Sequence, residues 1–158
     1  MRRVGEHPLH TPFGAMRGVA YTDSAGHGLH LALVHGDPAG KTAPLVRVHE
    51  PLSVLDLLDT QSHRHSWNLP QALRRIVTEG AGIAVLLNCG ESAEQIGEQF
   101  QRLLQPTPAP SKPGVAALRD YGIGAQILRD LGVRQMHLLG QPRKMPSMVG
   151  YGLEIVGF

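Results

Sequence analysis

The chain has 158 residues, of which 42% are apolar, a formal net charge of +2 and one cysteine. One cysteine excludes an internal disulfide, no apolar run approaches the length of a membrane-spanning helix, and basic residues are not interleaved with aromatic ones as in nucleic-acid-binding surfaces. The first eight residues also lack the apolar stretch of a signal peptide. We therefore expect one cytoplasmic domain, residues 1–158, that binds neither nucleic acid nor membrane.

The first third of the chain predicts antiparallel strands. Residues 16–22 and 29–36 read as two strands, and the polar, glycine-containing segment 23–28 between them is typical of a hairpin loop. A third strand is predicted over residues 43–49. The opening segment, residues 2–4, reads as a linker.

The middle of the chain predicts helices around a buried strand. Apolar residues at helical spacing predict a helix over residues 69–79, with a proline in its first turn and a glycine after its end. The continuous apolar run 82–87 predicts a strand covered on both faces. A second amphipathic helix is expected over residues 91–104, and a short helical turn over 55–58.

The last third continues the alternation. The proline-rich segment 106–114 cannot continue a helix and predicts an extended loop. A helix over 121–131, a strand over 135–139, a short helix over 144–150 and a strand over 153–156 follow. Antiparallel opening strands followed by strand–helix alternation indicate an α/β (α+β) fold with one mixed sheet.

Several segments resemble one family, in the same order along the chain. The most specific is Arg-Asp-Tyr-Gly-Ile-Gly-Ala-Gln-Ile-Leu-Arg-Asp-Leu-Gly-Val, and shorter matches surround it; together they cover residues 9–14, 30–37, 45–49, 119–133, 142–144 and 150–156. On these segments the chain resembles the GTP cyclohydrolase II domain of riboflavin biosynthesis. The resemblance implies that family's mixed-sheet fold.

The family holds a catalytic zinc with three cysteines, and the zinc activates the water that opens the imidazole ring of guanine. The matching positions here are Leu52, His63 and His65. Leucine cannot bind a metal, whereas imidazole can, so His63 and His65 are weak candidate ligands, with His49 as a third. The alternative is a polar, histidine-rich loop. We expect no cofactor, zinc included.

Five other residues match functional positions of the family. Arg119 matches the arginine proposed as a nucleophile at the α-phosphate, Arg47, His49 and Lys144 match phosphate-binding positions, and Asn68 stands where the family reads guanine with a glutamine. Because other residues of the family's site are missing, Arg119 can also be interpreted as a vestigial arginine near the start of a helix. Lys144 also reads as an ordinary surface lysine.

Other parts of the family's site are replaced. The run that contacts the substrate contains Glu-Gly-Arg in the family, whereas residues 86–92 here read Leu-Leu-Asn-Cys-Gly-Glu-Ser. The family's proton-accepting aspartate is Ala117. Most residues needed for ring opening are thus missing, and the sequence leaves open whether the chain is an enzyme.

Three interpretations remain open. The first is a catalytically inactive domain from a longer fusion protein, which dimerises with, stabilises or modulates a 3,4-dihydroxy-2-butanone 4-phosphate synthase, the enzyme to which this family is often fused. The second is an active GTP cyclohydrolase II with a rebuilt metal site. The third is a module that binds GTP or another phosphate ligand, in keeping with the basic pI. A homodimer is compatible with each.

Overall fold

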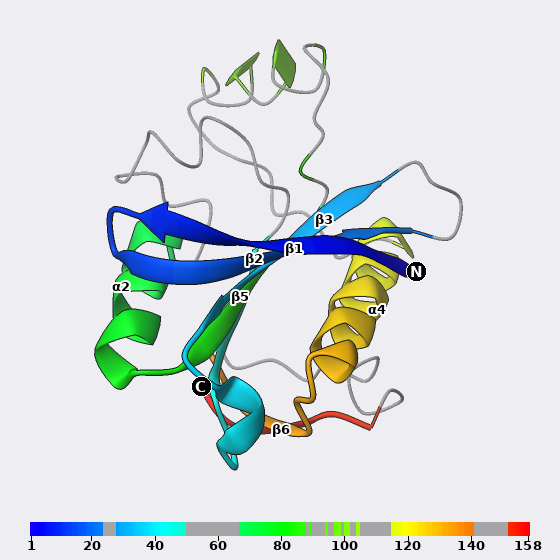
Figure 1. Cartoon of the computed structure of the whole chain (residues 1–158). Coiled ribbons are helices and arrows are strands. Elements are labelled where there is room, and N and C mark those ends of the chain that lie inside the picture. The colour runs from blue at the N-terminus through cyan, green and yellow to red at the C-terminus, as the bar shows by residue number, and fades with distance from the viewer. Residues whose placement is uncertain are drawn as a thin grey trace.

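The computed structural model describes most of the chain, including part of the candidate site. The described residues are 1–23, 28–49, 67–87, 115–140 and 152–158, together with 89, 94, 97, 98, 100, 101 and 104; of residues 115–121 only the backbone is described. Within them, strands form one mixed sheet and a helix lies on each side of it (Figure 1). This confirms the predicted fold class.

The sheet has seven strands in the described residues, in the order β1-β2-β3-β5-β4-β6-β7. Their bounds are β1 Arg2–Thr11, β2 Gly14–Thr22, β3 Leu29–His35, β4 Leu45–His49, β5 Gly82–Leu86, β6 Gln135–Leu138 and β7 Glu154–Gly157. The β1-β2, β2-β3 and β3-β5 pairs are antiparallel, whereas β5-β4, β4-β6 and β6-β7 are parallel. The carboxyl ends of β4, β5 and β6 therefore meet at one edge of the sheet.

Helix α2, Leu69–Glu79, covers one face. Its start is fixed by a capping box, in which the Asn68 side chain accepts from the backbone N–H of Gln71 and the Gln71 side chain accepts from the Asn68 N–H. Its end is fixed by Gly80, whose φ of 88° is easily adopted only by glycine. The apolar side of the helix is buried in one core cluster with Met16, Leu33 and Ala84 of the sheet.

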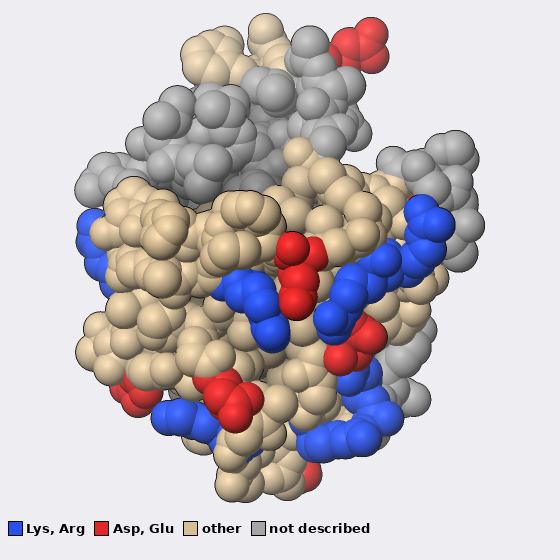
Figure 2. Space-filling model, viewed as in Figure 1, with Lys and Arg blue, Asp and Glu red and all other residues tan. Residues whose placement is uncertain are grey.

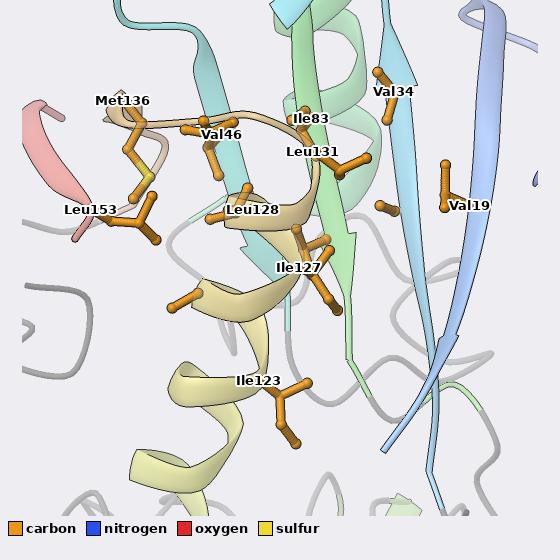
Figure 3. Packing of buried hydrophobic residues seen from close by; sticks show 14 of the residues in the cluster. Val19, Val34, Val46, Ile83, Ile123, Ile127, Leu128, Leu131, Met136 and Leu153 are labelled. Carbon is orange, nitrogen blue, oxygen red and sulfur yellow. The ribbon is translucent and has the colours of Figure 1, made fainter. Parts of the chain in front are cut away.

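Helix α4, Val115–Asp130, covers the opposite face. Ile123, Ile127 and Leu128 are buried in the second core cluster, with Val46 of β4 and Ile83 of β5 (Figure 3). The helix begins six residues before the predicted start at 121. Residues 115–120 are mostly good helix formers, and the proline-rich run before them had drawn the predicted boundary too far along the chain.

Strand β1 corrects the linker prediction for residues 2–4. It is ten residues long and pairs with β2 along its length, apart from a register shift between Arg3 and Gly5. Nine of its ten residues are exposed, so it carries no alternation of buried and exposed side chains. The hydrophobic pattern that identifies a strand was therefore absent from its sequence.

The remaining predicted elements agree with the structure in part. A short 3₁₀ helix, η1 Pro38–Gly40, follows β3 and was not predicted. Residues 94, 97, 98, 100 and 101 of the predicted helix 91–104 are helical. The predicted turn at 55–58 and helix at 144–150 lie outside the described residues. Among the described residues, no helix is long and apolar enough to cross a bilayer.

Candidate functional site at the carboxyl ends of the parallel strands

Arg47 lies on β4, close to the carboxyl edge shared by the parallel strands. This edge is where open sheets with parallel strands commonly bind ligands. The Arg47 side chain is nevertheless buried, with 6% of the residue exposed. Its Nη1 donates to the carbonyl of Leu139 over 2.8 Å and its Nη2 donates to the carbonyl of Trp67 over 3.0 Å.

His49 ends β4 and is fully buried. Its carbonyl accepts a hydrogen bond of 3.1 Å from the backbone N–H of Leu87, which extends the pairing with β5 by one step. Alternate residues of a strand share a face. His49, Arg47 and Leu45 therefore point to the face covered by α2, and Leu45 packs on the α2 core cluster.

Asn68 is the N-cap of α2 and follows Trp67, the residue whose carbonyl Arg47 binds. Its Oδ1 accepts from the Gln71 N–H over 2.9 Å. Such a bond satisfies one of the donors left open at the start of a helix. The structure therefore brings Arg47, His49 and Asn68 together at one edge of the sheet, and it gives Arg47 and Asn68 main-chain partners.

The other predicted site residues are placed less fully. Arg119 lies in the second turn of α4, not at its start, and only its backbone is described. Leu52, His63, His65 and Lys144 lie outside the described residues. Within the described part of the chain, no group of three His, Cys, Asp or Glu side chains could hold a metal ion.

Cys89 lies just beyond β5 and is half-buried. Its backbone N–H donates to the Leu29 carbonyl over 2.9 Å and its thiol donates to the Leu86 carbonyl over 3.3 Å. The chain has no other cysteine. A zinc site with three thiolates cannot be built from this chain alone, so the residues present do not fit the family's metal site.

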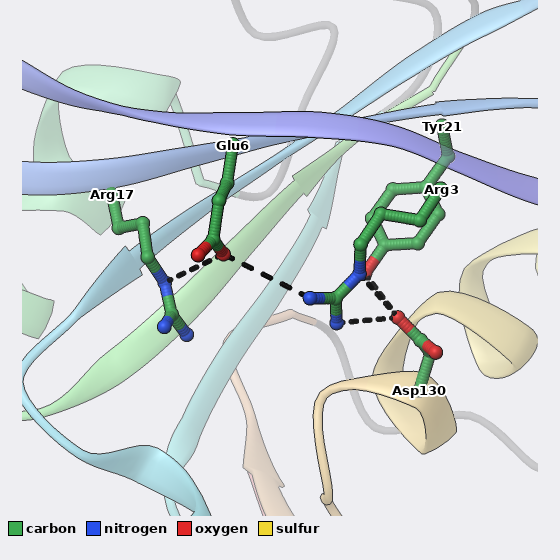
Figure 4. Close-up of polar contacts among 5 residues, drawn as sticks. All are labelled: Arg3, Glu6, Arg17, Tyr21 and Asp130. Atoms are coloured by element: carbon green, nitrogen blue, oxygen red, sulfur yellow. Dashed lines mark hydrogen bonds and ion pairs between the residues drawn. The ribbon is translucent and has the colours of Figure 1, made fainter.

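A polar cluster that joins α4 to strands β1 and β2 was not predicted. Asp130 ends α4, which leads into the start of β6, and its Oδ2 accepts from the Tyr21 hydroxyl over 2.7 Å and from Arg3 Nη2 over 2.6 Å (Figure 4). Glu6 continues the chain of charges, at 3.8 Å from Arg3 and 3.7 Å from Arg17.

These contacts change the titration of the cluster. Burial, and then the hydrogen bond to Asp130, raises the pKa of Tyr21 well above its ordinary value, so the hydroxyl stays protonated and donates. Burial alone would raise the pKa of Asp130, but the hydrogen bonds from Tyr21 and Arg3 outweigh it and lower that pKa. No sequence signal joins these residues, since Tyr21 and Asp130 are 109 positions apart.

The surface seen from this side carries charges of both signs. Lysine and arginine side chains alternate with aspartate and glutamate over the sheet and α4, without an extended patch of one sign (Figure 2). Mixed charges of this kind solvate a surface and do not focus a field on a polyanion. The view gives no support for a basic ligand surface on this face.

A sequence model of the GTP cyclohydrolase II family matches residues 2–158. The chain belongs to the GTP cyclohydrolase II family. A relative from Neisseria meningitidis serogroup A, named 3,4-dihydroxy-2-butanone 4-phosphate synthase, is 41% identical over 155 residues, which are 98% of this chain and 41% of the relative. A riboflavin biosynthesis protein RibBA from Chlorobium phaeovibrioides is 38% identical over 99% of this chain and 40% of its own length.

The fold has also been seen in a crystal structure of RibBX, a two-domain 3,4-dihydroxy-2-butanone 4-phosphate synthase from A. baumannii. The superposition has a TM-score of 0.64, covers 99% of this chain and 40% of that one, and the two share 24% of their residues. The chain thus spans about two fifths of the length of each of these three proteins. The matches place it among riboflavin biosynthesis proteins.

Proposed function

We propose that the chain is a GTP cyclohydrolase II-like domain that has lost ring-opening activity and supports a 3,4-dihydroxy-2-butanone 4-phosphate synthase to which it is joined. The thiol count carries this proposal. Three thiolates hold the zinc in the family that the sequence resembles, and this chain has one cysteine, whose thiol is directed at the Leu86 carbonyl. Without a metal, the family's route to a water nucleophile is missing.

The rest of the site supports the same conclusion. Asn68, at the guanine-reading position, is used as the N-cap of α2, and Arg47, at a phosphate position, binds two main-chain carbonyls. The relatives from two Neisseria meningitidis strains carry a matching segment and are named for the synthase alone. Their names are in keeping with a domain that is retained for something other than ring opening.

The first test is an assay of GTP ring opening. Purified protein with zinc supplied is incubated with GTP beside an authentic GTP cyclohydrolase II, and formate release is measured. We expect no release above the background without enzyme. If formate is released, a His63→Ala/His65→Ala double variant tests a rebuilt metal site: loss of both the activity and the bound zinc would establish the active enzyme and overturn the proposal.

The second test addresses the supporting role. The intact protein that contains this domain is compared with a version that ends before it, and the rate of 3,4-dihydroxy-2-butanone 4-phosphate formation, the thermal midpoint and the sedimentation mass are measured. We expect at least one of the three to fall when the domain is removed. Three unchanged values would reject the supporting role while leaving the loss of ring opening intact.

A further inference from the structure

Arg47 occupies a position that the family resemblance assigns to phosphate, yet its two terminal nitrogens each donate to a main-chain carbonyl. We infer that Arg47 is a positioning residue, which fixes the start of α2 and the end of β6 against β4, with peptide carbonyls in place of phosphate oxygens as its ligands. This inference goes beyond the proposed function, because it concerns how the edge of the sheet is built whether or not the domain opens guanine.

The geometry uses the guanidinium fork. Nη1 and Nη2 each donate to a different carbonyl, and those carbonyls belong to residues 92 and 20 positions away in the chain. A planar guanidinium holds two donors at a fixed separation, whereas a lysine ammonium acts as a point charge. Arg47 can therefore bridge Leu139 and Trp67 in a way that lysine cannot.

Both bridged residues lie next to the end of a secondary-structure element. Leu139 follows β6, and its own N–H donates to the Val46 carbonyl over 2.8 Å, so that Leu139 is held to β4 through both its N–H and its carbonyl. Trp67 immediately precedes the N-cap of α2. In the sequence, His65 lies two positions before Trp67 and Lys144 five positions after Leu139. Arg47 thus anchors the ends of the two segments that carry the remaining candidate residues.

Burial makes the bridge hard to replace. Arg47 is 6% exposed and Leu139 is 5% exposed, so water has little access to the Leu139 carbonyl if the guanidinium is removed. When a buried acceptor loses its donor, the cost of removing that acceptor from water is no longer compensated by a hydrogen bond. A bidentate phosphate would have to displace both carbonyls, one of them buried, to use the same two nitrogens.

The experiment compares Arg47→Met and Arg47→Lys with the wild type, and with Arg17→Met as the control for losing an exposed arginine from the same sheet. Amide hydrogen exchange is measured by NMR at Leu139 and at Ala72, whose N–H bonds the Asn68 carbonyl, with Leu131 of the α4 end as reference. We expect both Arg47 variants to speed exchange at Leu139 and Ala72 relative to Leu131, by about tenfold for Arg47→Met, which is the scale of losing a hydrogen bond to a charged group.

A pyrophosphate titration of the thermal midpoint separates the two roles. If Arg47 positions Trp67 and Leu139, the midpoint depends on pyrophosphate in the same way with and without the guanidinium. If Arg47 is a phosphate ligand, the wild type and Arg47→Lys gain stability with pyrophosphate and Arg47→Met does not, and that result would overturn the inference. Should Arg47→Met fail to fold, Arg47→Lys decides alone: unchanged exchange at Leu139 and Ala72 contradicts the inference. None of these readouts uses GTP ring opening, so the outcome is independent of the proposed function.

Discussion

Strands β5 and β1 belong to the same sheet and are stabilised in different ways. All five residues of β5 are buried, since α2 covers one face and α4 the other. Nine of the ten residues of β1 are exposed, and β1 lies at the edge of the sheet with β2 as its neighbour (Figure 1). Burial of apolar area therefore stabilises β5, while β1 depends on its backbone ladder and on the contact of Arg3 with Asp130.

The contrast between β5 and β1 indicates where the sheet can change without loss of the fold. Arg47 and His49 belong to β4, which pairs with the buried strand β5, so a substitution near these two residues disturbs the core. Strand β1 lies four positions away from β4 in the strand order, and among the described residues no strand pairs with its outer side. A surface that must meet another chain or domain is more easily remodelled there.

The largest expected effect is a core truncation in β5. Ile83 is fully buried between β4 and α4, whereas Val4 on β1 is 56% exposed. Ile83→Ala should lower the free energy of unfolding by about 2–5 kcal/mol, the range for deleting a buried isoleucine side chain. Val4→Ala should cost less than about 0.5 kcal/mol. Urea unfolding followed by circular dichroism measures both; equal losses would mean that β1 is covered in solution and would end the comparison.

The same contrast explains what the sequence could predict. The continuous apolar run of β5 and the helical spacing of Leu69, Leu73 and Ile76 were visible because burial imposes a pattern on the chain. Strand β1 was missed because a strand exposed on both faces has no such pattern. The first six residues of α4 were missed because propensity alone, next to a proline-rich run, is a weak signal.

The candidate site was predictable only in part. The resemblance identified Arg47, His49 and Asn68, and the structure places the three at one edge of the sheet. It could not supply their partners, because Arg47 binds peptide carbonyls and any residue type can provide one. The contact between Tyr21 and Asp130 was likewise invisible, since it depends on the packing of α4 on the sheet.

A smaller effect is expected at the polar contacts of Asp130 that join α4 to β1 and β2. Asp130→Asn removes the charge that Arg3 and Tyr21 bind, and should lower the free energy of unfolding by about 0.5–1 kcal/mol at neutral pH, because the pair is close to half-exposed. A carboxylate at the end of α4 also opposes the helix dipole, and its removal offsets part of the loss. Glu98→Gln, at an exposed carboxylate, is the control.

The pH dependence of that difference follows from the lowered pKa of Asp130. A carboxyl whose pKa is lower in the folded than in the unfolded state stabilises the fold above its unfolded value of about 3.9, and the stabilisation is lost as the pH falls through the folded value. The gap between wild type and Asp130→Asn should be constant above about pH 5 and shrink below about pH 4. Thermal midpoints at a series of pH values measure it; a gap that widens on acidification would contradict the assigned contacts.

The smallest effect on stability is expected at Pro8, on the strand β1. Thr11 and Gly14 flank a two-residue hairpin turn, and His7 is opposite Gly18. In this register the N–H groups of His7, Leu9 and Thr11 face β2. The backbone of Pro8, which is opposite Arg17, therefore faces away from β2, toward the open edge. Proline has no N–H to offer a further strand, and prolines on edge strands are a common protection against edge-to-edge association.

Pro8→Val adds a donor to the open edge of β1, whereas the matched change His10→Val adds a similar side chain at a position whose N–H already faces that edge, so the number of donors there stays the same. Both should change the free energy of unfolding by less than about 0.5 kcal/mol, as exposed substitutions usually do. Sedimentation velocity over a range of protein concentrations should show more self-association for Pro8→Val than for the wild type or His10→Val. Equal sedimentation of all three would show that β1 is protected by its charges and its register shift near Gly5 and not by the proline. In either case the core would be untouched, because β1 is held by its backbone ladder and by the contact of Arg3 with Asp130, and not by buried apolar side chains.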